Sequence, residues 1–526
     1  MHRQRKTQMP RKRPRQPGAH VLNEVLSVPE ARLRSLGISD GTWRETFRLV
    51  FERPEDTAVK VLTAGQWVVA LAFLLVLMAG LLADPSLALT VINALVIGFY
   101  LTIVAYKFWL IHLSLGGSAG ITVSADELAA LRDEALPPYT ILVPLFHETE
   151  SLDRLLEGLR AIDYPADRLQ ALLLLEEDDA ATREAVRSKE LPPFARVIVV
   201  PDGHPKTKPR ACNVGLAHAT GEYLVIYDAE DRPEPDQLKK AVVAFAKTPT
   251  DVICLQARLN FYNKRQNLLT RLFTLEYSMW FDLFLPGLSD LGAPIPLGGT
   301  SNHFRTARLR ELMGWDPFNV TEDCDLGVRI ARRGYATRML DSTTWEEACS
   351  HPRHWIRQRS RWVKGYIQTY LVALRRPFAI ARRVGLARAL GFHVMVGGTP
   401  FSLLVNPLYW TLTTLWFTLR WEGVTRLFPF PIVLWGLVCL FAGNFAFVYA
   451  TLLAAFRRGD YDLVKYGLLV PFYWLLMSVG AWKGFLQLLT RPSYWEKTRH
   501  GLDIEAGYVE HPSGSEEPAA RTADSG

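Results

Sequence analysis

Two long apolar runs near the N-terminus constrain the fold of this chain more than any other feature. Residues 65–83 contain no charged residue, and a second apolar run covers residues 87–106. A helix of about 20 apolar residues crosses the ~30 Å hydrocarbon core of a bilayer. Asp84 and Pro85 lie between the two runs and fit a tight turn. We therefore expect a transmembrane hairpin over residues 65–113.

Apolar segments return toward the C-terminus, at residues 391–419, 431–456 and 466–489. They predict transmembrane segments within residues 391–489, and the first, interrupted by Pro400 and Pro407, is expected to be broken or partly interfacial. Residues 366–390 mix five arginines with apolar side chains, as expected of a basic interfacial helix. Residues 277–288 are apolar but too short to span, and are expected along the bilayer surface.

The placement of lysine and arginine sets the expected orientation, because these residues accumulate on the cytoplasmic side of a membrane. The basic N-terminal run and the basic residues within 375–388 and 457–465 would lie inside, which places the central domain in the cytoplasm. We expect a multi-pass protein of the inner (plasma) membrane. Three full C-terminal crossings would put Arg491 and the basic residues after it outside, so we expect one segment not to span.

The two ends of the chain are expected to be disordered tails. Residues 1–19 are basic and broken by prolines, which suits a solvated tail attracted to anionic lipid headgroups, and residues 20–64 are expected to be a cytoplasmic segment. Residues 505–526 are polar and rich in small residues. The net charge of +7 suggests nucleic acid, but no aromatic platform or reading helix supports such a partner, so none is expected. Five scattered cysteines form no zinc or disulfide pattern.

Between residues 137 and 365 the pattern changes to short aliphatic strands that alternate with amphipathic helices. Strands are predicted at residues 139–145, 171–177, 196–201, 222–230 and 252–259. Such alternation predicts an α/β, Rossmann-like domain with a mostly parallel sheet and helices on both faces. Its ligands are expected beyond the carboxyl ends of the strands. The expected fold joins this cytoplasmic domain to an α-helical transmembrane bundle.

Acidic residues follow two of these predicted strands. Asp228, Glu230 and Asp231 come at the end of the fourth strand, and Glu176–Asp179 end the second. Mg²⁺ and Mn²⁺ prefer oxygen ligands and keep phosphate oxygens in their shell, so such clusters suit a metal–diphosphate clamp. Acidic residues after strands are also common helix N-caps, and both interpretations stay open at this point.

Two further sets of polar residues stand closer to the C-terminus. Glu322 and Asp323 open a helical stretch, where they are either ordinary capping residues or the general base of a group transfer. Gln358, Arg361 and Trp362 follow. An arginine fork binds phosphate oxygens, and a tryptophan offers an apolar face to a sugar ring. Alone, this set also fits a basic amphipathic helix at a membrane.

In this order and between membrane segments, the four sets resemble the processive family 2 glycosyltransferases, which include bacterial cellulose, mixed-linkage β-glucan, curdlan, chitin and hyaluronan synthases. The resemblance covers roughly residues 137–500. It implies a GT-A domain that transfers a sugar, with inversion, from a UDP-sugar such as UDP-glucose to the end of a growing β-glycan at the cytoplasmic face. It also implies a Mg²⁺ or Mn²⁺ ion, bound by Asp228 with either Glu230 or Asp231, and accessory export subunits as partners.

The same resemblance assigns the donor site. Asp178 or Asp179 is expected to contact the uracil, and Arg210 to lie near the diphosphate, where the family often has lysine. Gln358 and Arg361 are expected to hold the diphosphate. These roles agree with the chemistry, because the leaving nucleotide develops negative charge that cationic groups stabilise in the transition state.

The acceptor site follows from the resemblance as well. Asp323 is expected to be the base that deprotonates the acceptor hydroxyl, with Glu322 beside it. Trp362 is expected beneath the terminal sugar of the acceptor, and Gly299 and Thr300 in a loop of small residues near it.

The segment after the last apolar run resembles the family's gating segment, which closes over the bound nucleotide from the cytoplasmic side. It covers residues 490–504 and contains Trp495, Lys497 and Thr498. Lys483, inside the last apolar run, is a candidate functional residue because a charge within a membrane segment is costly.

Two alternative functions stay open. A non-processive enzyme would add one sugar to a membrane lipid or polyprenyl phosphate, so the acceptor is either a glycan or lipid-linked. An inactive membrane scaffold would keep the fold without the reaction, and the intact Asp228, Asp323 and Arg361 argue against it.

Overall fold

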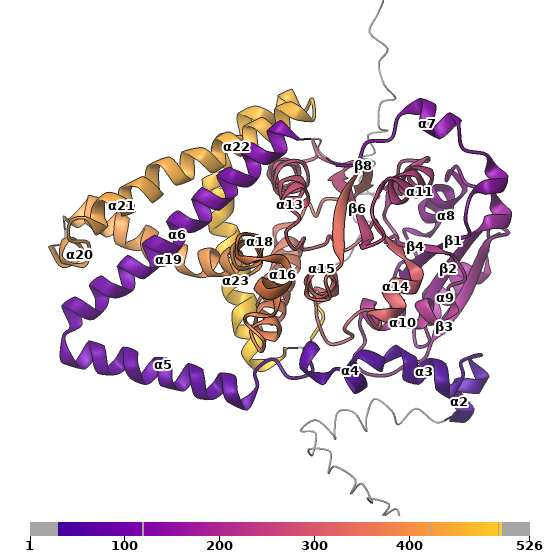
Figure 1. Ribbon diagram of the computed structural model, residues 1–526, viewed down its shortest axis with the longest axis horizontal. Helices are drawn as coiled ribbons and strands as arrows, with labels where there is room; N and C mark the ends of the chain where they lie inside the picture. The colour runs from indigo at the N-terminus through magenta and orange to yellow at the C-terminus, as the bar shows by residue number, and fades with distance from the viewer. Residues whose placement is uncertain (1–29, 118–119, 421, 493, 497–526) are drawn as a thin grey trace, which may run out of the picture.

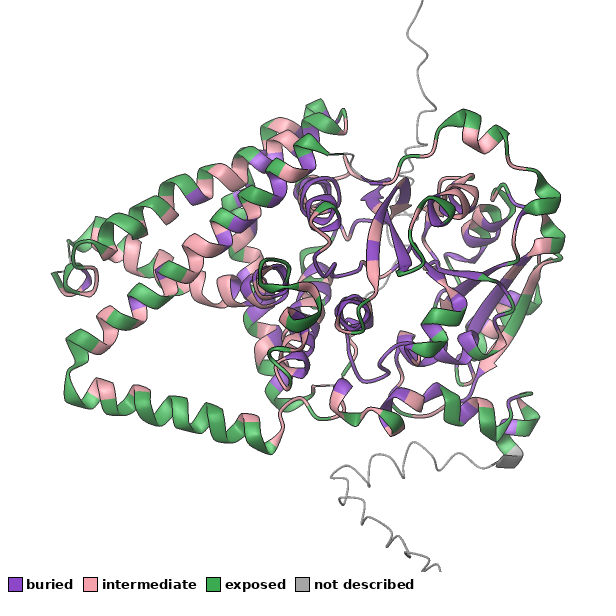
Figure 2. Ribbon diagram, in the orientation of Figure 1, coloured by how far each residue is buried: buried purple, intermediate pink, exposed green. Residues whose placement is uncertain are grey.

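The chain divides into a sheet domain and a group of long helices (Figure 1). The structure is a computed structural model that describes residues 30–117, 120–420, 422–492 and 494–496. Figure 2 shows that the sheet domain has a continuous buried interior, whereas helices α5 and α21 are largely exposed and α22 is only partly exposed. These helices run from Ala64 to Ala83, from Ile432 to Val438 and from Asn444 to Arg457.

The sheet has eight strands in the order β3-β2-β1-β4-β7-β6-β8-β5. The strands are β1 (Tyr139–Leu145), β2 (Leu169–Glu176), β3 (Ala195–Val200), β4 (Tyr223–Ile226), β5 (Arg232–Pro233), β6 (Val252–Phe261), β7 (Asn302–Arg305) and β8 (Ala336–Glu346). Strands β3, β2, β1 and β4 are mutually parallel, and β6 is parallel to β8. Strand β7 joins the two groups and is antiparallel to both of its neighbours. The predicted mostly parallel sheet is therefore confirmed, with β5, β7 and β8 added to the five predicted strands.

Both faces of the sheet are covered, which explains the continuous aliphatic runs of its central strands. Along β1, Ile141 and Val143 pack into one buried cluster and Leu142 packs into the other. Helix α10 (Lys208–His218) covers one face, and α8 (Leu152–Arg160) and α11 (Gln237–Lys247) cover the other. The helices hold the strand ends in place, so side chains just beyond the strands have fixed positions.

Among the described residues, five helical stretches are long and apolar enough to cross a bilayer. They cover residues 64–83, 85–116, 386–419, 432–457 and 461–490. Helices α5 and α6 (Pro85–Gly116) occupy the expected hairpin, and Asp84 caps α6 by accepting a hydrogen bond from the Leu87 amide at 3.0 Å. The crossing of a membrane by each stretch stays a prediction.

The apolar residues 277–288 do not lie on a surface, contrary to expectation. They run through α12 (Leu268–Met279), a π-helical turn (Trp280–Phe284) and α13 (Leu285–Leu291). Most of their apolar side chains are buried. A Cβ on Gly287 would lie 2.3 Å from the Leu110 carbonyl oxygen of α6, so α13 packs directly on α6. We call the helices of the five long apolar stretches membrane-type helices, and α6 is one of them. The segment is apolar because it joins the sheet domain to that helix.

Residues 366–390 form several helices where one interfacial helix was expected. They contain the end of α16 (Pro352–Ala373), α17 (Ala379–Val384) and the start of α18 (Leu386–Phe392). Helix α16 packs along α23 (Val470–Thr490), the last long helix of the described chain. The helix that carries Gln358, Arg361 and Trp362 is therefore braced by a membrane-type helix.

Candidate active site

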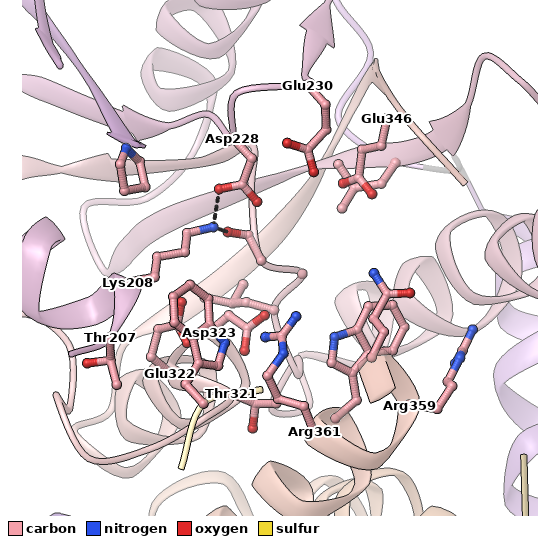
Figure 3. A pocket seen from close by; sticks show the side chains of 18 of the residues that line it. Thr207, Lys208, Asp228, Glu230, Thr321, Glu322, Asp323, Glu346, Arg359 and Arg361 are labelled. Atoms are coloured by element: carbon pink, nitrogen blue, oxygen red, sulfur yellow. Dashed lines mark hydrogen bonds and ion pairs between the residues drawn. The ribbon is translucent and has the colours of Figure 1, made fainter. Parts of the chain in front are cut away.

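A pocket of about 260 Å³ lies at the carboxyl ends of the strands, where the parallel sheet predicts a ligand site. Its walls come from the ends of β1, β4 and β8 and from the first turns of α10 and α15 (Glu322–Arg332), and α16 closes it (Figure 3). Its wall includes the predicted residues Asp228, Glu230, Gly299, Glu322, Asp323, Gln358, Arg361, Trp362 and Trp495.

Lys208 forms the centre of the polar wall, and the sequence analysis did not identify it. Its ammonium donates to Asp228 Oδ1 at 2.5 Å and to the Gly299 carbonyl oxygen at 2.7 Å (Figure 3). Burial lowers the pKa of Lys208, but the charges of Asp228 and Glu322 outweigh it and hold this pKa well above its ordinary value. The side chain is thus a permanent cation at the bottom of the pocket. Its position just before Pro209, at the start of a helix that begins beside the strand ends, was the available signal.

Glu230 and Asp231 point in different directions. Asp231 is 4% exposed, and its Oδ2 accepts hydrogen bonds from the Asp228 amide at 2.7 Å and from the Thr300 hydroxyl. Asp231 and Thr300 therefore stabilise the loop that carries Asp228, and Asp231 does so from the protein interior. Glu230 extends into the pocket and faces Glu346, from the end of β8 (Figure 3). Burial and the charge of Asp228 raise the pKa of Glu230 well above its ordinary value.

Arg210 is in the protein interior, not in the pocket wall where a diphosphate ligand would need it. Its side chain is fully buried and donates to a carboxylate oxygen of Glu176 and to the Gly203 carbonyl oxygen, the latter at 2.5 Å. Burial raises the pKa of Glu176 to about 7, against the charge of Arg210. This pair fixes the end of β2, and Lys208 takes the place in the pocket that the sequence analysis gave to Arg210.

Asp178 and Asp179 have separate surroundings. Asp179 is buried and caps α9 (Ala180–Arg187), since it accepts from the Thr182 amide at 3.2 Å and from the His147 amide at 2.6 Å. Burial alone would raise the pKa of Asp179, but these hydrogen bonds bring it below its ordinary value. Asp178 is half-exposed and pairs with Lys206, which belongs to the pocket wall. Of the two, Asp178 is the one at the rim of the pocket.

Glu322 and Asp323 begin α15 and face the pocket floor (Figure 3). Asp323 Oδ1 accepts a hydrogen bond from the Cys324 amide at 2.7 Å, and a Cβ on Gly299 would lie 3.4 Å from Asp323 Oδ2. Burial raises the pKa of Asp323, against the Cys324 amide and the charges of Lys208 and Arg361. Burial and the charge of Asp323 raise the pKa of Glu322 to about 7. The pair is therefore easier to protonate than exposed carboxylates.

Helix α16 supplies the remaining wall. Gln358, Arg361 and Trp362 all line the pocket, and the buried Gln358 Oε1 has no hydrogen-bond partner among the residues that the structure describes. Burial lowers the pKa of Arg361, while Glu322 and Asp323 oppose this effect. The wall thus has an amide oxygen, a guanidinium and an indole within two turns of one helix.

Arg359 braces this wall from behind, and sequence analysis gave it no role. Its guanidinium lies 4.5 Å from the ring centre of Trp362 and pairs with Glu276 of α12. Tyr473 of α23 donates to the same carboxylate at 2.7 Å. The orientation of Trp362 therefore depends on α12 and α23 together.

Residues 137–365, which contain the sheet and most of the pocket, match the family described as Glycosyltransferase like family 2. The chain carries a glycosyltransferase domain. The probable glycosyltransferase YdaM of Bacillus subtilis is 26% identical over 251 residues, which are 47% of this chain and 60% of that protein. Glucomannan 4-beta-mannosyltransferase 1 of Oryza sativa is 27% identical over 218 residues, which are 40% of this chain and 42% of that protein. The chain spans about half the length of the curated relatives it matches.

The chain is also similar to a solved structure, a mannosyltransferase from Pyrobaculum calidifontis in complex with GDP-Man and Mn²⁺. The TM-score is 0.50 at 19% sequence identity, and the match covers 76% of this chain and 99% of that one. This likeness shows the fold and confirms a GT-A-like domain, as predicted from the sequence.

The chain after α23 returns to the glycosyltransferase domain. Lys364 donates to the Tyr494 carbonyl oxygen at 2.6 Å, and Gln368 donates to the Pro492 carbonyl oxygen at 3.0 Å. The Arg361 guanidinium lies 5.5 Å from the ring centre of Trp495, which covers the pocket from this side. The other residues of the gating-like segment, Lys497 and Thr498, lie outside the described residues.

Lys483, the charge inside the last apolar run, has a partner in this returning segment. Its ammonium pairs with Glu496 at 2.9 Å, and Gln487 donates to the same carboxylate at 3.0 Å. The charge therefore holds the segment against α23, which accounts for its presence in an apolar helix.

Proposed function

We propose that this protein transfers a sugar from a nucleoside-diphosphate sugar to an acceptor hydroxyl at the cytoplasmic face of the inner membrane, with inversion at the anomeric carbon. One observation carries the proposal: Lys208, Asp228, Asp323 and Arg361 meet in one pocket at the strand ends, beside membrane-type helices. Two cations suit a diphosphate, and a separate carboxylate suits an acceptor hydroxyl.

The donor end of the site is proposed to be formed by Lys208, Gln358 and Arg361, which hold and orient the diphosphate. Lys208 replaces Arg210 in this role because its ammonium faces the pocket. Asp178, which pairs with Lys206 at the rim, is the proposed contact to the nucleobase of the donor. Negative charge that develops on the leaving diphosphate is then met by fixed positive charge.

A Mg²⁺ or Mn²⁺ site fits the acidic side of the pocket. Asp228 and Glu230 both face it, and the raised pKa of Glu230 reflects burial and carboxylate repulsion that a divalent cation would relieve. Among the described residues no three acidic, histidine or cysteine side chains gather into a metal site, so donor phosphates would supply further ligands, as is usual for Mg²⁺. Such an ion supplies positive charge to the leaving diphosphate. The similar Pyrobaculum mannosyltransferase was solved with GDP-Man and Mn²⁺.

Asp323 is proposed to receive the proton of the acceptor hydroxyl. The freed oxygen then bonds to the anomeric carbon on the face opposite the diphosphate, the bond to the diphosphate breaks, and the electron pair leaves with the nucleotide. A carboxylate with a raised pKa is a stronger base than an exposed one, so the raised pKa of Asp323 favours this step. One transfer inverts the configuration and needs no covalent intermediate.

The acceptor is proposed to lie on the indole face of Trp362, near Gly299. The names of the plant relatives favour extension of a β-glycan, with UDP-glucose and GDP-mannose as the two donors to compare. Export subunits remain part of this polymerase proposal, and transfer of one sugar to a lipid is the second candidate.

An assay of the purified full chain in lipid nanodiscs tests the proposal. We would supply radiolabelled UDP-glucose or GDP-mannose, Mg²⁺ or Mn²⁺, and lipid or glycan acceptors, and separate the products by size and polarity. We expect label in an acceptor with an anomeric configuration opposite to that of the donor. Failure of every nucleotide sugar both to bind and to react would overturn the proposal.

A further inference from the structure

A second cavity, of about 420 Å³, adjoins the active-site pocket. It lies among α6, α12, α19 (Thr399–Leu419), α22 and α23, and falls within the roughly 300–1,000 Å³ usual for ligand sites. The two hollows share the wall residues Glu276, Trp280, Thr399, Leu403 and Met477. The two hollows are therefore adjacent, one at the strand ends and the other among the membrane-type helices.

The polar groups in the wall of this second cavity are mostly paired with each other or with nearby protein groups. The Tyr100 hydroxyl donates to Asn406, and the Tyr473 hydroxyl donates to Glu276 at 2.7 Å. The Tyr409 hydroxyl donates to Asn93 at 2.8 Å. A glycan chain would bring many hydroxyls that need partners, and burying them without hydrogen bonds is costly. The rest of the wall is mainly aliphatic and aromatic, which suits a hydrocarbon chain.

One cation in the wall, Lys107, forms no ion pair within the described part of the chain. The ammonium of Lys107 lies 5.3 Å from the ring centre of Phe284 and 5.0 Å from that of Phe447. Among the described residues no carboxylate forms an ion pair with it, and Glu276 in the same wall pairs with Arg359 and accepts from Tyr473. A partly buried cation between aromatic faces is complementary to a phosphate group.

We infer that the acceptor is a polyprenyl-phosphate-linked sugar. Its hydrocarbon chain occupies the second cavity, its phosphate faces Lys107, and its sugar reaches Trp362 and Asp323 in the active-site pocket. This inference rests on the proposed glycosyl transfer and names its acceptor. A sugar on diacylglycerol would leave Lys107 without an anion, and a free glycan would leave the apolar wall without a partner.

The test compares four acceptors with the full chain in nanodiscs. They are a polyprenyl-phosphate-linked glucose, the same headgroup on a short citronellyl chain, a glucosyl-diacylglycerol and a soluble cello-oligosaccharide. We expect kcat/KM for the first to exceed that for the short-chain acceptor at least tenfold. Equal or faster transfer to the oligosaccharide or to the diacylglycerol lipid would overturn the inference while leaving glycosyl transfer intact. No transfer to any acceptor from either donor would overturn the proposed function and this inference with it.

Two substitutions test whether the hydrocarbon chain lies in the second cavity with its phosphate at Lys107. Leu440, in the cavity wall, is changed to Trp to fill the space, and we expect the long-chain preference to fall about tenfold. Val438→Trp is the matched control, because Val438 lies on the same helical stretch outside that wall and is 38% exposed. Lys107→Met should raise KM for the phosphate-linked acceptor without raising it for the diacylglycerol lipid. An unchanged long-chain preference in Leu440→Trp would show that the chain lies elsewhere.

Discussion

In the candidate active site, the proposed base Asp323 is partly buried and lies near an amide and two cationic side chains. Burial raises its pKa, while the Cys324 amide, Lys208 and Arg361 limit the rise. The carboxylate is thus more basic than an exposed aspartate. Its neighbour Glu322, with a pKa of about 7, shares the same enclosed space.

Asp323→Asn tests the role of this carboxylate directly. The amide has the same shape but cannot accept the proton, so we expect kcat to fall about 10²–10⁴-fold, as is typical for loss of general base catalysis. Nucleotide affinity, measured by calorimetry, should change little because Asp323 is not in the proposed donor contacts. Asp126→Asn, an exposed acid in the first turn of α7 (Ala125–Ala129), is the matched control. A variant at position 323 with normal transfer would refute the assignment.

The pH dependence of transfer should report the charge of Lys208. Lys208→Met removes a positive charge that lowers the pKa of Asp323, so that pKa should rise further. Because Asp323 must be unprotonated to act, the acid limb of the kcat profile should move to higher pH. Lys206→Met is the control, since Lys206 pairs with Asp178 and Asp202. An acid limb that stays in place, or moves to lower pH, would contradict this electrostatic picture.

At the level of elements, α16 and α23 pack so closely that their backbones nearly touch. A Cβ on Gly484 of α23 would lie 2.4 Å from the Ser360 carbonyl oxygen of α16. Ser360 stands between Arg359 and Arg361, so this contact also positions the pocket wall. The position therefore requires glycine for reasons of space.

Gly484→Ala should separate the two helices. Overpacking in a close interface costs about 1–3 kcal/mol, so we expect a lower unfolding midpoint in nanodiscs together with a lower kcat. Gly98→Ala in α6 is the control, because a Cβ there meets nothing within 4 Å. Equal unfolding midpoints and rates for both variants would mean that α23 shifts to accommodate the added methyl group without displacing α16.

The sequence predicted the elements whose residues carry a periodic apolar signal. The five predicted strands are aliphatic, whereas β8 contains Ser342, Thr343 and Thr344. These polar side chains are buried and hydrogen-bonded, for example Ser342 and Thr344 to Gln237, and such pairing leaves no hydropathy pattern. Strand β8 was therefore missed, and Glu346 at its end was missed with it.

The sequence located the acidic residues near the site, but it did not predict the direction in which each side chain points. Asp228, Glu230 and Asp231 are adjacent, yet only the first two face the pocket. Asp179 caps a helix and Arg210 pairs with Glu176, so two expected donor residues support the framework instead. Side-chain direction depends on loop backbone geometry and on long-range partners, which residue type and spacing do not encode.

On the scale of the whole molecule, the returning segment 491–496 bears on membrane topology. Its backbone accepts hydrogen bonds from Lys364 and Gln368 of α16, on the side of the glycosyltransferase domain. The residues just after α23 and the catalytic pocket therefore share one side of any membrane. This agrees with an even number of C-terminal crossings, and we predict that one of the three apolar C-terminal stretches does not cross completely.

Compartment reporters check this topology. We expect a reporter fused after Gly526 and one inserted in the loop between α9 and β3 to give the same cytoplasmic signal. The reporter placed between α5 and α6, at Asp84, should give the opposite signal. Opposite signals from the first two fusions would show that all three C-terminal stretches cross.

Because Lys208 pairs with Asp228, the folding stability of the protein should not depend on the metal ion that its activity is proposed to need. The Lys208 ammonium is a counter-ion for Asp228, so we expect the acidic side of the pocket to keep its shape without a bound divalent cation. We expect chelation with EDTA to stop sugar transfer while leaving the unfolding midpoint unchanged within error, and a large drop in the midpoint would disprove this. In a cell short of divalent metal, the protein would then persist at full abundance in a resting form, and production of its glycoconjugate would follow the supply of metal and donor without new synthesis of the enzyme.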